Sequence, residues 1–281
     1  MKIAVFGGTG FIGKELRKIL EANGHEVLLL DTRKDSGWAS QLKALDVVVN
    51  LAGHPLFKDR WNNKIKALIY DSRIEGTKKI VNALEGSSVH TFISSSAIGI
   101  YGASEREADE KSSLADDFLA RVCKDWEDAA LVAQRRFKVR TVLLRTGIVL
   151  GKNGGALDQL LLPFKLGVGG PIGNGSQSMS WIHIQDLAGI ILHCIQNDKI
   201  SGAINGTAPN IVSNKEFSKT LGKVLNRPAV LPLPAFALHV VVGEAASVIA
   251  SGQRAHPKAA LESGYTYKFP YLEAALREIL K

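Results

Sequence analysis

The chain has 281 residues, of which 46% are hydrophobic and 22% are charged, and its formal net charge is +8 at pH 7. This length allows one large α/β domain with a buried core, and the ordinary composition argues against a disordered chain or a coiled coil. Its two cysteines cannot form a disulfide framework or a metal cage, so we expect no metal site. No signal-peptide pattern opens the sequence and no apolar run approaches the roughly 18 residues of a membrane helix, so we expect a soluble cytoplasmic protein.

The net charge of +8 raises the question of nucleic-acid binding. The basic residues are scattered, and the densest clusters are the pairs Arg135-Arg136 and Lys78-Lys79. Patch geometry, rather than net charge, marks a nucleic-acid binder, and no basic stripe with interleaved aromatics is present. We therefore expect no nucleic-acid or membrane partner. The charge fits a solvated basic surface, together with a pocket for a small anionic molecule.

Short apolar runs alternate with amphipathic helical patterns in the first half of the chain. The predicted strands cover 3–6, 27–30, 47–49, 91–93 and 139–144, and the predicted helices cover 12–20, 65–84 and 114–133. Alternation of strands and helices implies crossover connections and a parallel sheet covered on both faces. The predicted fold class is therefore α/β, with a doubly wound parallel sheet.

The composition shifts after Leu150. Glycine-rich loops at 151–155 and 167–175 surround a short apolar helix at 157–164, and a last amphipathic helix covers 272–280. We predict a main domain of residues 1–150 and 182–210, with a smaller C-terminal substrate lobe of residues 151–181 and 211–281.

The segment Gly7-Gly8-Thr9-Gly10-Phe11-Ile12-Gly13 lies between the first strand and the first helix. Glycines there allow a tight turn and let backbone amides approach a pyrophosphate, whose charge is favoured at a helix N-terminus. The order along the chain is a strand, the glycine segment, a helix and a second strand, which is the order in a dinucleotide-binding Rossmann domain. We therefore assign cofactor contacts to Gly7, Thr9, Gly10, Phe11, Ile12 and Gly13.

The end of the second strand bears on the choice between NAD and NADP. Asp31 can accept hydrogen bonds from both ribose hydroxyls and would repel a 2′-phosphate, which favours NAD. Arg33 and Lys34 follow at once and could hold that phosphate if Asp31 turned aside, so NADP stays open.

The G-x-x-G-x-x-G spacing resembles that of the extended short-chain dehydrogenase/reductases, which include nucleotide-sugar epimerases and dehydratases. Further motifs narrow the resemblance to an atypical branch catalogued as nucleoside-diphosphate-sugar epimerases. The narrowing motifs are Asp125-Trp126-Glu127, Pro163-Phe164, residues 169–173 and 181–184, Gly252-Gln253-Arg254, Pro257-Lys258 and Gly264-Tyr265. Three further segments are similar to those of the superfamily as a whole: Asn50-Leu51-Ala52-Gly53, the serine-rich segment 94–102 and Leu144 to Gly151. The resemblance covers essentially the whole chain. It implies an NAD(P)(H) cofactor flanked by Leu51, Ala52 and Gly53.

Members of this superfamily use a tyrosine, four residues before a lysine on one helix, as acid and base. None of the five tyrosines of this chain is followed by a lysine at that spacing. If Glu127 marks the helix register, Leu119 replaces the tyrosine and Cys123 the lysine, whereas a slip of one residue brings Phe118 and Val122. Neither register supplies the pair.

The remaining candidates are polar residues near the expected cleft. Ser96 matches the serine that polarises the substrate carbonyl, and Tyr101 could supply a proton from the adjoining loop. Arg145 and Arg254 lie on segments that face the cleft in relatives and suit an anionic substrate. The first hypothesis is an oxidoreductase or sugar-nucleotide epimerase, and the second is a non-catalytic NAD(P)-sensing regulatory or scaffold protein. The sequence leaves the oligomeric state open, with a homodimer among the options.

Overall fold

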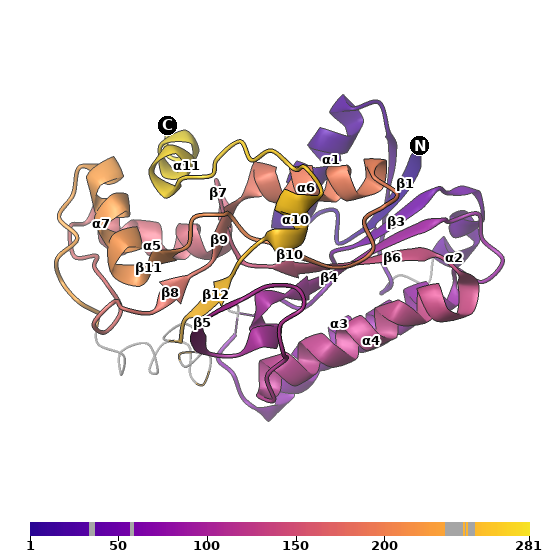
Figure 1. Ribbon diagram of the computed structural model, residues 1–281, viewed down its shortest axis with the longest axis horizontal. Coiled ribbons are helices and arrows are strands. Elements are labelled where there is room, and N and C mark those ends of the chain that lie inside the picture. Colours follow the sequence, from indigo (N-terminus) through magenta and orange to yellow (C-terminus); the bar gives the residue numbers. More distant parts are fainter. Residues whose placement is uncertain (34–36, 57–58, 234–243, 245, 247–250) are drawn as a thin grey trace.

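The computed structural model describes residues 1–33, 37–56, 59–233, 244, 246 and 251–281. Its centre is a parallel sheet of six strands in the order β10-β6-β4-β3-β1-β2 (Figure 1). The strands are β1 (Lys2–Phe6), β2 (Glu26–Leu30), β3 (Val47–Asn50), β4 (Thr91–Ala97), β6 (Arg140–Thr146) and β10 (Gly202–Gly206). The chain passes from β1 to β2 on one side and then to β3 on the other. This reversal opens a crevice at the carboxyl ends of β1 and β3.

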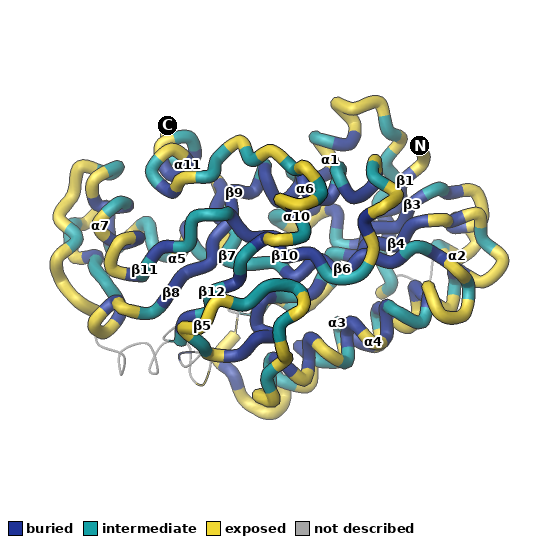
Figure 2. Tube along the Cα trace, in the orientation of Figure 1, coloured by how far each residue is buried: buried dark blue, intermediate teal, exposed yellow. Residues whose placement is uncertain are grey.

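Helices cover both faces of this sheet, as the alternating residues of β1 require. Ile3 and Val5 face a core shared with α1 (Phe11–Ala22) and α6 (Ile184–Gln196). Ala4 and Phe6 face the opposite core, which contains residues of α3 (Asn63–Asn82) and α4 (Phe118–Phe137). Side chains of neighbouring strand residues point to opposite faces, so one strand contributes to both cores. Figure 2 shows the buried stripe that α4 turns toward the sheet. The predicted doubly wound parallel sheet is confirmed.

A smaller lobe lies beyond the carboxyl ends of the central strands, at the left of Figure 1. It contains α5 (Gly155–Lys165), α7 (Asn214–Leu225), α11 (Leu272–Ile279) and the antiparallel pair β8 (Ser178–Met179) and β11 (Val212–Ser213). The parallel pair β7 (Ile148–Gly151) and β9 (Trp181–His183) joins it to the main sheet. The lobe has a core of its own, which includes Trp181, Phe217 and Leu276. The predicted residue division between domain and lobe stays a prediction.

The C-terminal region also returns to the main domain, which the composition did not indicate. Strand β12 (Gln253–Ala255) pairs in parallel with β5 (Ser104–Ala108). Ala260 of α10 (Lys258–Glu262) is fully buried in the core shared with α6. The remaining short elements are α2 (Trp38–Gln41), η1 (Leu42–Ala44) and η2 (Ile98–Tyr101). None of the helices in the described part of the chain is long and apolar enough to span a bilayer.

Candidate functional site

The turn between β1 and α1 forms a close-packed glycine cradle. Gly7 has a φ of +76°, and a Cβ there would lie 2.7 Å from the carbonyl carbon of Leu51. A Cβ at Gly13 would lie 2.4 Å from the Gly7 carbonyl oxygen. Only glycine fits at these two positions, because each Cβ would overlap backbone atoms. The sequence therefore brings the start of α1 against the loop that follows β3.

The N-terminus of α1 suits the pyrophosphate of a dinucleotide. Gly10 caps the helix without a side-chain hydrogen bond, and Thr9 and Gly10 are exposed. The first amides of a helix lack intrahelical acceptors and attract anions. The Phe11 ring packs against the second glycine segment, where a Cβ at Gly154 would lie 2.6 Å from it. A contact of Phe11 with the cofactor would therefore come from its backbone, and the cradle as a whole fits the predicted cofactor.

The two residues predicted to select between NAD and NADP bind each other. The Arg33 guanidinium donates from Nη2 to Asp31 Oδ2 at 2.7 Å and from Nε to Oδ1 at 3.0 Å. The Asp31 carboxylate raises the pKa of Arg33, mainly through this hydrogen bonding. Arg33 is largely exposed, so it can turn without unfolding the strand end. Lys34, the third residue of this hypothesis, lies outside the described residues.

Two adjoining cavities extend from the carboxyl ends of β3, β4 and β6. The first, of about 300 Å³, is lined by the loop after β3, by the end of β4 and by α3 and α4. Its described lining includes Ile12, Leu51, Ala52, Gly53, Arg73, Ser96, Leu119, Cys123 and Trp126. The second, of about 410 Å³, shares Gly99 and Leu119 with the first. We call them the inner cavity and the outer cavity, respectively.

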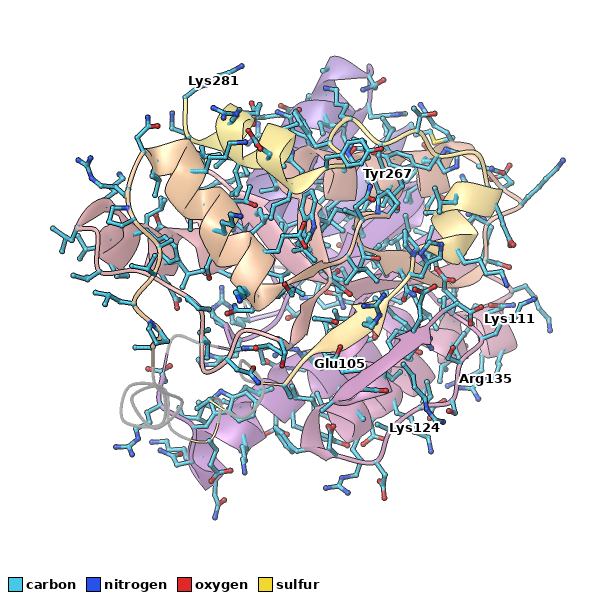
Figure 3. All side chains as sticks on the ribbon, turned by 60° about the vertical axis from the view of Figure 1, so that its left-hand side comes forward. Glu105, Lys111, Lys124, Arg135, Tyr267 and Lys281 are labelled. Atoms are coloured by element: carbon cyan, nitrogen blue, oxygen red, sulfur yellow. The ribbon has the colours of Figure 1, made fainter. Side chains whose placement is uncertain are left out.

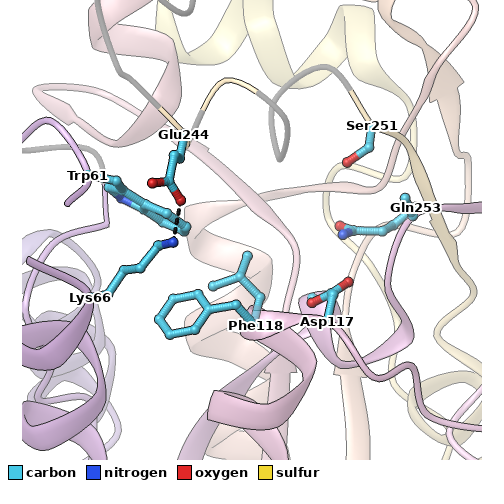
Figure 4. Close-up of a pocket in the computed structure, with 10 residues that line it drawn as sticks. Trp61, Lys66, Asp117, Phe118, Glu244, Ser251 and Gln253 are labelled. Atoms are coloured by element: carbon cyan, nitrogen blue, oxygen red, sulfur yellow. Dashed lines mark hydrogen bonds and ion pairs between the residues drawn. The ribbon is translucent and has the colours of Figure 1, made fainter. Parts of the chain in front are cut away.

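The outer cavity carries charges of both signs. Figure 4 shows Lys66 of α3 paired with Glu244 on one side, and Asp117, Ser251 and Gln253 on the other. Phe118 lies between these two groups at the start of α4. Because Gly99 and Leu119 line both cavities, a polar molecule in the outer cavity would reach the inner one beside these two residues.

Ser96 lies in the inner cavity and belongs to a buried hydrogen-bond network. Its hydroxyl donates to Glu127 Oε1 at 2.6 Å. Arg145 binds the same carboxylate through Nε and Nη2, each at 2.8 Å. Glu127 and Arg145 are 6% and 5% exposed, and the bidentate geometry compensates for the burial of both charges. The predicted substrate-binding Arg145 thus has its guanidinium satisfied inside the chain, which favours a positioning role over a substrate contact.

Tyr101 extends this network from Arg145 to Asn205. Its hydroxyl donates to Asn205 Oδ1 at 2.8 Å and accepts from Arg145 Nη1 at 3.0 Å. It is not among the described residues that line either cavity. Burial raises the pKa of Tyr101, although the Arg145 charge opposes this. Among the described residues, Tyr101 is therefore linked to Ser96 through Arg145 and Glu127, and its role as a proton donor stays a prediction.

Helix α4 turns Leu119, Val122 and Cys123 into the inner cavity, while Phe118 lines only the outer one. The lysine positions of both registers therefore line the inner cavity, and only the tyrosine position distinguishes them, with Leu119 inside and Phe118 outside. Burial raises the pKa of the Cys123 thiol to about 12, so the thiol stays protonated at pH 7. Lys124 is exposed on the outer side of α4, as Figure 3 shows, and cannot replace the missing lysine.

Arg254 lies on β12 with its side chain 39% exposed, and its Nη2 is 3.7 Å from Glu107 Oε2. It lines neither cavity among the described residues, although its neighbour Gln253 lines the outer one. His183 caps α6 and binds Glu278 Oε2 at 2.9 Å, which gives it a structural role. Within the described ranges, no group of three or more His, Cys, Asp or Glu side chains could hold a metal ion.

Sequence reasoning missed three residues of this site. Glu127 entered only as part of a family motif and as a register marker, and Asn205 and Arg73 were not considered. An acidic residue on the buried face of α4 is a signal that could have indicated Glu127, because such a charge needs a partner. No local pattern marks Asn205 or Arg73, whose places depend on distant segments.

Comparison with known proteins identifies the family. The NAD dependent epimerase/dehydratase family matches residues 3–205 of the chain. The chain belongs to this family. A second profile, a domain of unknown function (DUF1731), matches residues 233–279.

Relatives match the chain over its whole length. It is 40% identical to the human epimerase family protein SDR39U1, with 100% of each chain covered. It is also 40% identical to the chloroplastic SDR39U1 homolog of Arabidopsis thaliana, with 100% of this chain and 87% of the relative covered. The crystal structure of human SDR39U1 (isoform 2) with NADPH superposes with a TM-score of 0.92 at 39% identity and 99% coverage of both chains. The atypical epimerase branch expected from the motifs is therefore confirmed.

Proposed function

We propose that this protein binds NAD(P)(H) and uses it as an oxidoreductase or sugar-nucleotide epimerase. One observation carries the proposal: the glycine cradle packs against the loop after β3, and Ile12 of α1 lines the inner cavity together with Ser96 at the end of β4. The N-terminal amides of α1 would bind the pyrophosphate, and Leu51, Ala52 and Gly53 would flank the nicotinamide half. When bound, the nicotinamide ring supplies a hydride donor or acceptor.

Ser96 and Glu127 would hold the proton of the reacting oxygen. The Ser96 hydroxyl has one proton, which it donates to Glu127, so its oxygen is free to accept a hydrogen bond from a substrate hydroxyl. Arg145 fixes the Glu127 carboxylate and thereby orients Ser96. A substrate hydroxyl would thus give its proton toward the serine–carboxylate pair, which replaces the superfamily's tyrosine in this role.

The choice of cofactor depends on the Asp31–Arg33 pair. The positive charge of Arg33 lies beside that of the Asp31 carboxylate, so the two side chains together repel a 2′-phosphate less than an isolated carboxylate would. We propose that the site accepts both cofactors and that Arg33 turns to bind the 2′-phosphate of NADPH. The NADPH bound to human SDR39U1 supports this proposal over the NAD preference that Asp31 alone suggests.

Calorimetric titration with NADH and NADPH tests cofactor binding. Arg33→Met should weaken NADPH about tenfold and leave NADH within about twofold, because one charge-assisted hydrogen bond to phosphate is lost. Arg17→Met, on the exposed face of α1, is the charge-matched control. Equal loss of both cofactors in Arg33→Met would contradict the 2′-phosphate assignment. Turnover is then measured with a panel of carbonyl compounds and nucleotide sugars.

A second candidate function is that of an NAD(P) sensor without chemistry. It is favoured by the internal hydrogen bonds of Ser96 and Tyr101, both of which donate their protons to other residues of the chain. This candidate predicts cofactor-dependent stabilisation without turnover. Hydride transfer at an ordinary rate would reject it. The substrate, a homodimer and a cytoplasmic location stay predictions of the sequence.

A further inference from the structure

Arg73 places a guanidinium in the inner cavity from α3. Its Nη1 donates to the carbonyl oxygens of His54 and Ile69, both at 3.1 Å. Within the described part of the chain, Nε and Nη2 have no hydrogen-bond partner, and no carboxylate forms an ion pair with Arg73. These two nitrogens form the edge of a guanidinium that binds a carboxylate or phosphate bidentately.

The packing around Arg73 holds the guanidinium in place. Its Cζ lies 5.2 Å from the centre of the Trp126 ring, and the Trp126 indole donates to Thr77 Oγ1 at 2.9 Å. A Cβ at Gly53 would lie 3.2 Å from the Arg73 Cζ, so the guanidinium occupies the space beside this glycine. Backbone carbonyls, an aromatic face and a glycine therefore orient the side chain without neutralising it.

The charge of Arg73 is uncompensated in this cavity. No Asp or Glu is among the described residues that line it. Burial lowers the pKa of Arg73 to about 10, which leaves the guanidinium protonated at pH 7. A partly buried charge with open donors is costly unless water or a ligand meets it. An anion with two oxygens would satisfy both the charge and the open edge.

The location of Arg73 connects it to the reacting centre. It lines the same cavity as Ser96 and as Val122 and Cys123, the two positions that correspond to the superfamily's lysine in the two possible registers of α4. We propose that Arg73 is an oxyanion-binding residue that receives a carboxylate or phosphate of the substrate beside the nicotinamide. The cation that α4 lacks is thus supplied from α3. This inference rests on the proposed function and narrows its substrate class to molecules with such a group near the reacting carbon.

The test is titration of the full-length protein with oxalate and with inorganic phosphate, each with and without NADPH. Binding is followed by calorimetry and by the Nε–H resonance of Arg73 in nitrogen-15 spectra. We expect oxalate to shift this resonance and Arg73→Met to weaken oxalate about tenfold or more. Arg73→Lys should give an intermediate affinity, because the charge remains and the bidentate edge is lost. Lys78→Met, an exposed position of α3, is the charge-matched control.

The outcomes separate this inference from the proposed function. Equal oxalate affinity in Arg73→Met and wild type, or no binding of either anion to wild type, would overturn it. Loss of NADPH affinity in proportion to oxalate affinity would also overturn it, because the guanidinium would then serve a cofactor phosphate. If wild type binds oxalate through Arg73 but does not bind NADPH, the proposed function fails and the anion site stands. NADPH affinity in Arg73→Met within about threefold of wild type supports the substrate assignment.

Discussion

Arg145 shares the Glu127 carboxylate with Ser96, Arg73 lines the same cavity as Ser96, and the two arginines differ in what surrounds them. Arg145 comes from the sheet and meets Glu127 bidentately, with Tyr101 and the Glu110 carbonyl on its remaining nitrogen. Arg73 comes from a covering helix and meets two backbone carbonyls and an aromatic ring. The difference shows that a buried arginine whose charge is matched internally is a structural part of a site, whereas an unmatched one has the capacity to bind a ligand.

The largest expected effect is on folding. Arg145→Met leaves the Glu127 carboxylate buried without its cation and should lower the free energy of unfolding by about 3–5 kcal/mol. Arg73→Met removes no carboxylate partner and should cost about 1 kcal/mol. Urea unfolding followed by circular dichroism measures both. Similar losses in the two variants would remove the distinction between the two arginines.

The second effect is on catalysis. Ser96→Ala removes the oxygen that faces the inner cavity and should lower kcat about a hundredfold with little change in cofactor affinity. Ser94→Ala, a buried position of the same strand that lines neither cavity among the described residues, is the matched control. Steady-state kinetics on any substrate found in the panel gives the ratio. Unchanged turnover in Ser96→Ala would remove Ser96 from the mechanism.

The third effect distinguishes Arg73 from Arg145 through the addition of one methyl group beside Arg73. Gly53→Ala brings a Cβ within 3.2 Å of the Arg73 Cζ and should displace the guanidinium. We expect about tenfold weaker oxalate binding, because two aligned hydrogen bonds lose their geometry. Among the described residues, the Arg73 hydrogen bonds involve no member of the Arg145 network, so the urea midpoint should change little. Intact oxalate affinity in this variant would show that the position of Arg73 is not fixed by Gly53.

The smallest effect concerns Cys123, whose thiol interacts electrostatically with both Arg73 and Arg145. Burial raises its pKa to about 12, with Glu127 raising it further and Arg73 and Arg145 lowering it. At pH 8 the native thiol should therefore contain about a thousandfold less thiolate than a free cysteine. Arg73→Met should raise the pKa of Cys123 further, because it removes a positive charge that stabilises the thiolate. Alkylation of Cys123 by iodoacetamide should therefore be severalfold slower in Arg73→Met than in wild type.

Cys194 is the internal control, since its pKa is also raised to about 12 by burial and only Arg140 opposes the shift. Faster alkylation of Cys123 in Arg73→Met would contradict the sign of this interaction. Because the folded-state pKa of Cys123 lies above its unfolded value of about 8.5, the associated stability is complete below that pH. It should decline as the pH rises toward 12.

The parallel sheet and the glycine turn after its first strand could be predicted from the sequence. The alternation of strands and helices, the glycines from Gly7 to Gly13 and the absence of a Tyr–Lys pair are local patterns. Local patterns determine local conformation, and the close approach of Gly13 to Gly7 in the structure is the reason that these glycines are required.

Only the tertiary structure decided which polar groups face the cavities. Ser96 meets Glu127 across 31 positions, and Tyr101 meets Asn205 across 104. The pairing of β12 with β5, and the absence of a carboxylate beside Arg73 among the described residues, likewise depend on segments far apart in the chain. Sequence patterns indicate the helix or strand to which a residue belongs. The partner of a buried charge depends instead on how distant elements pack against one another.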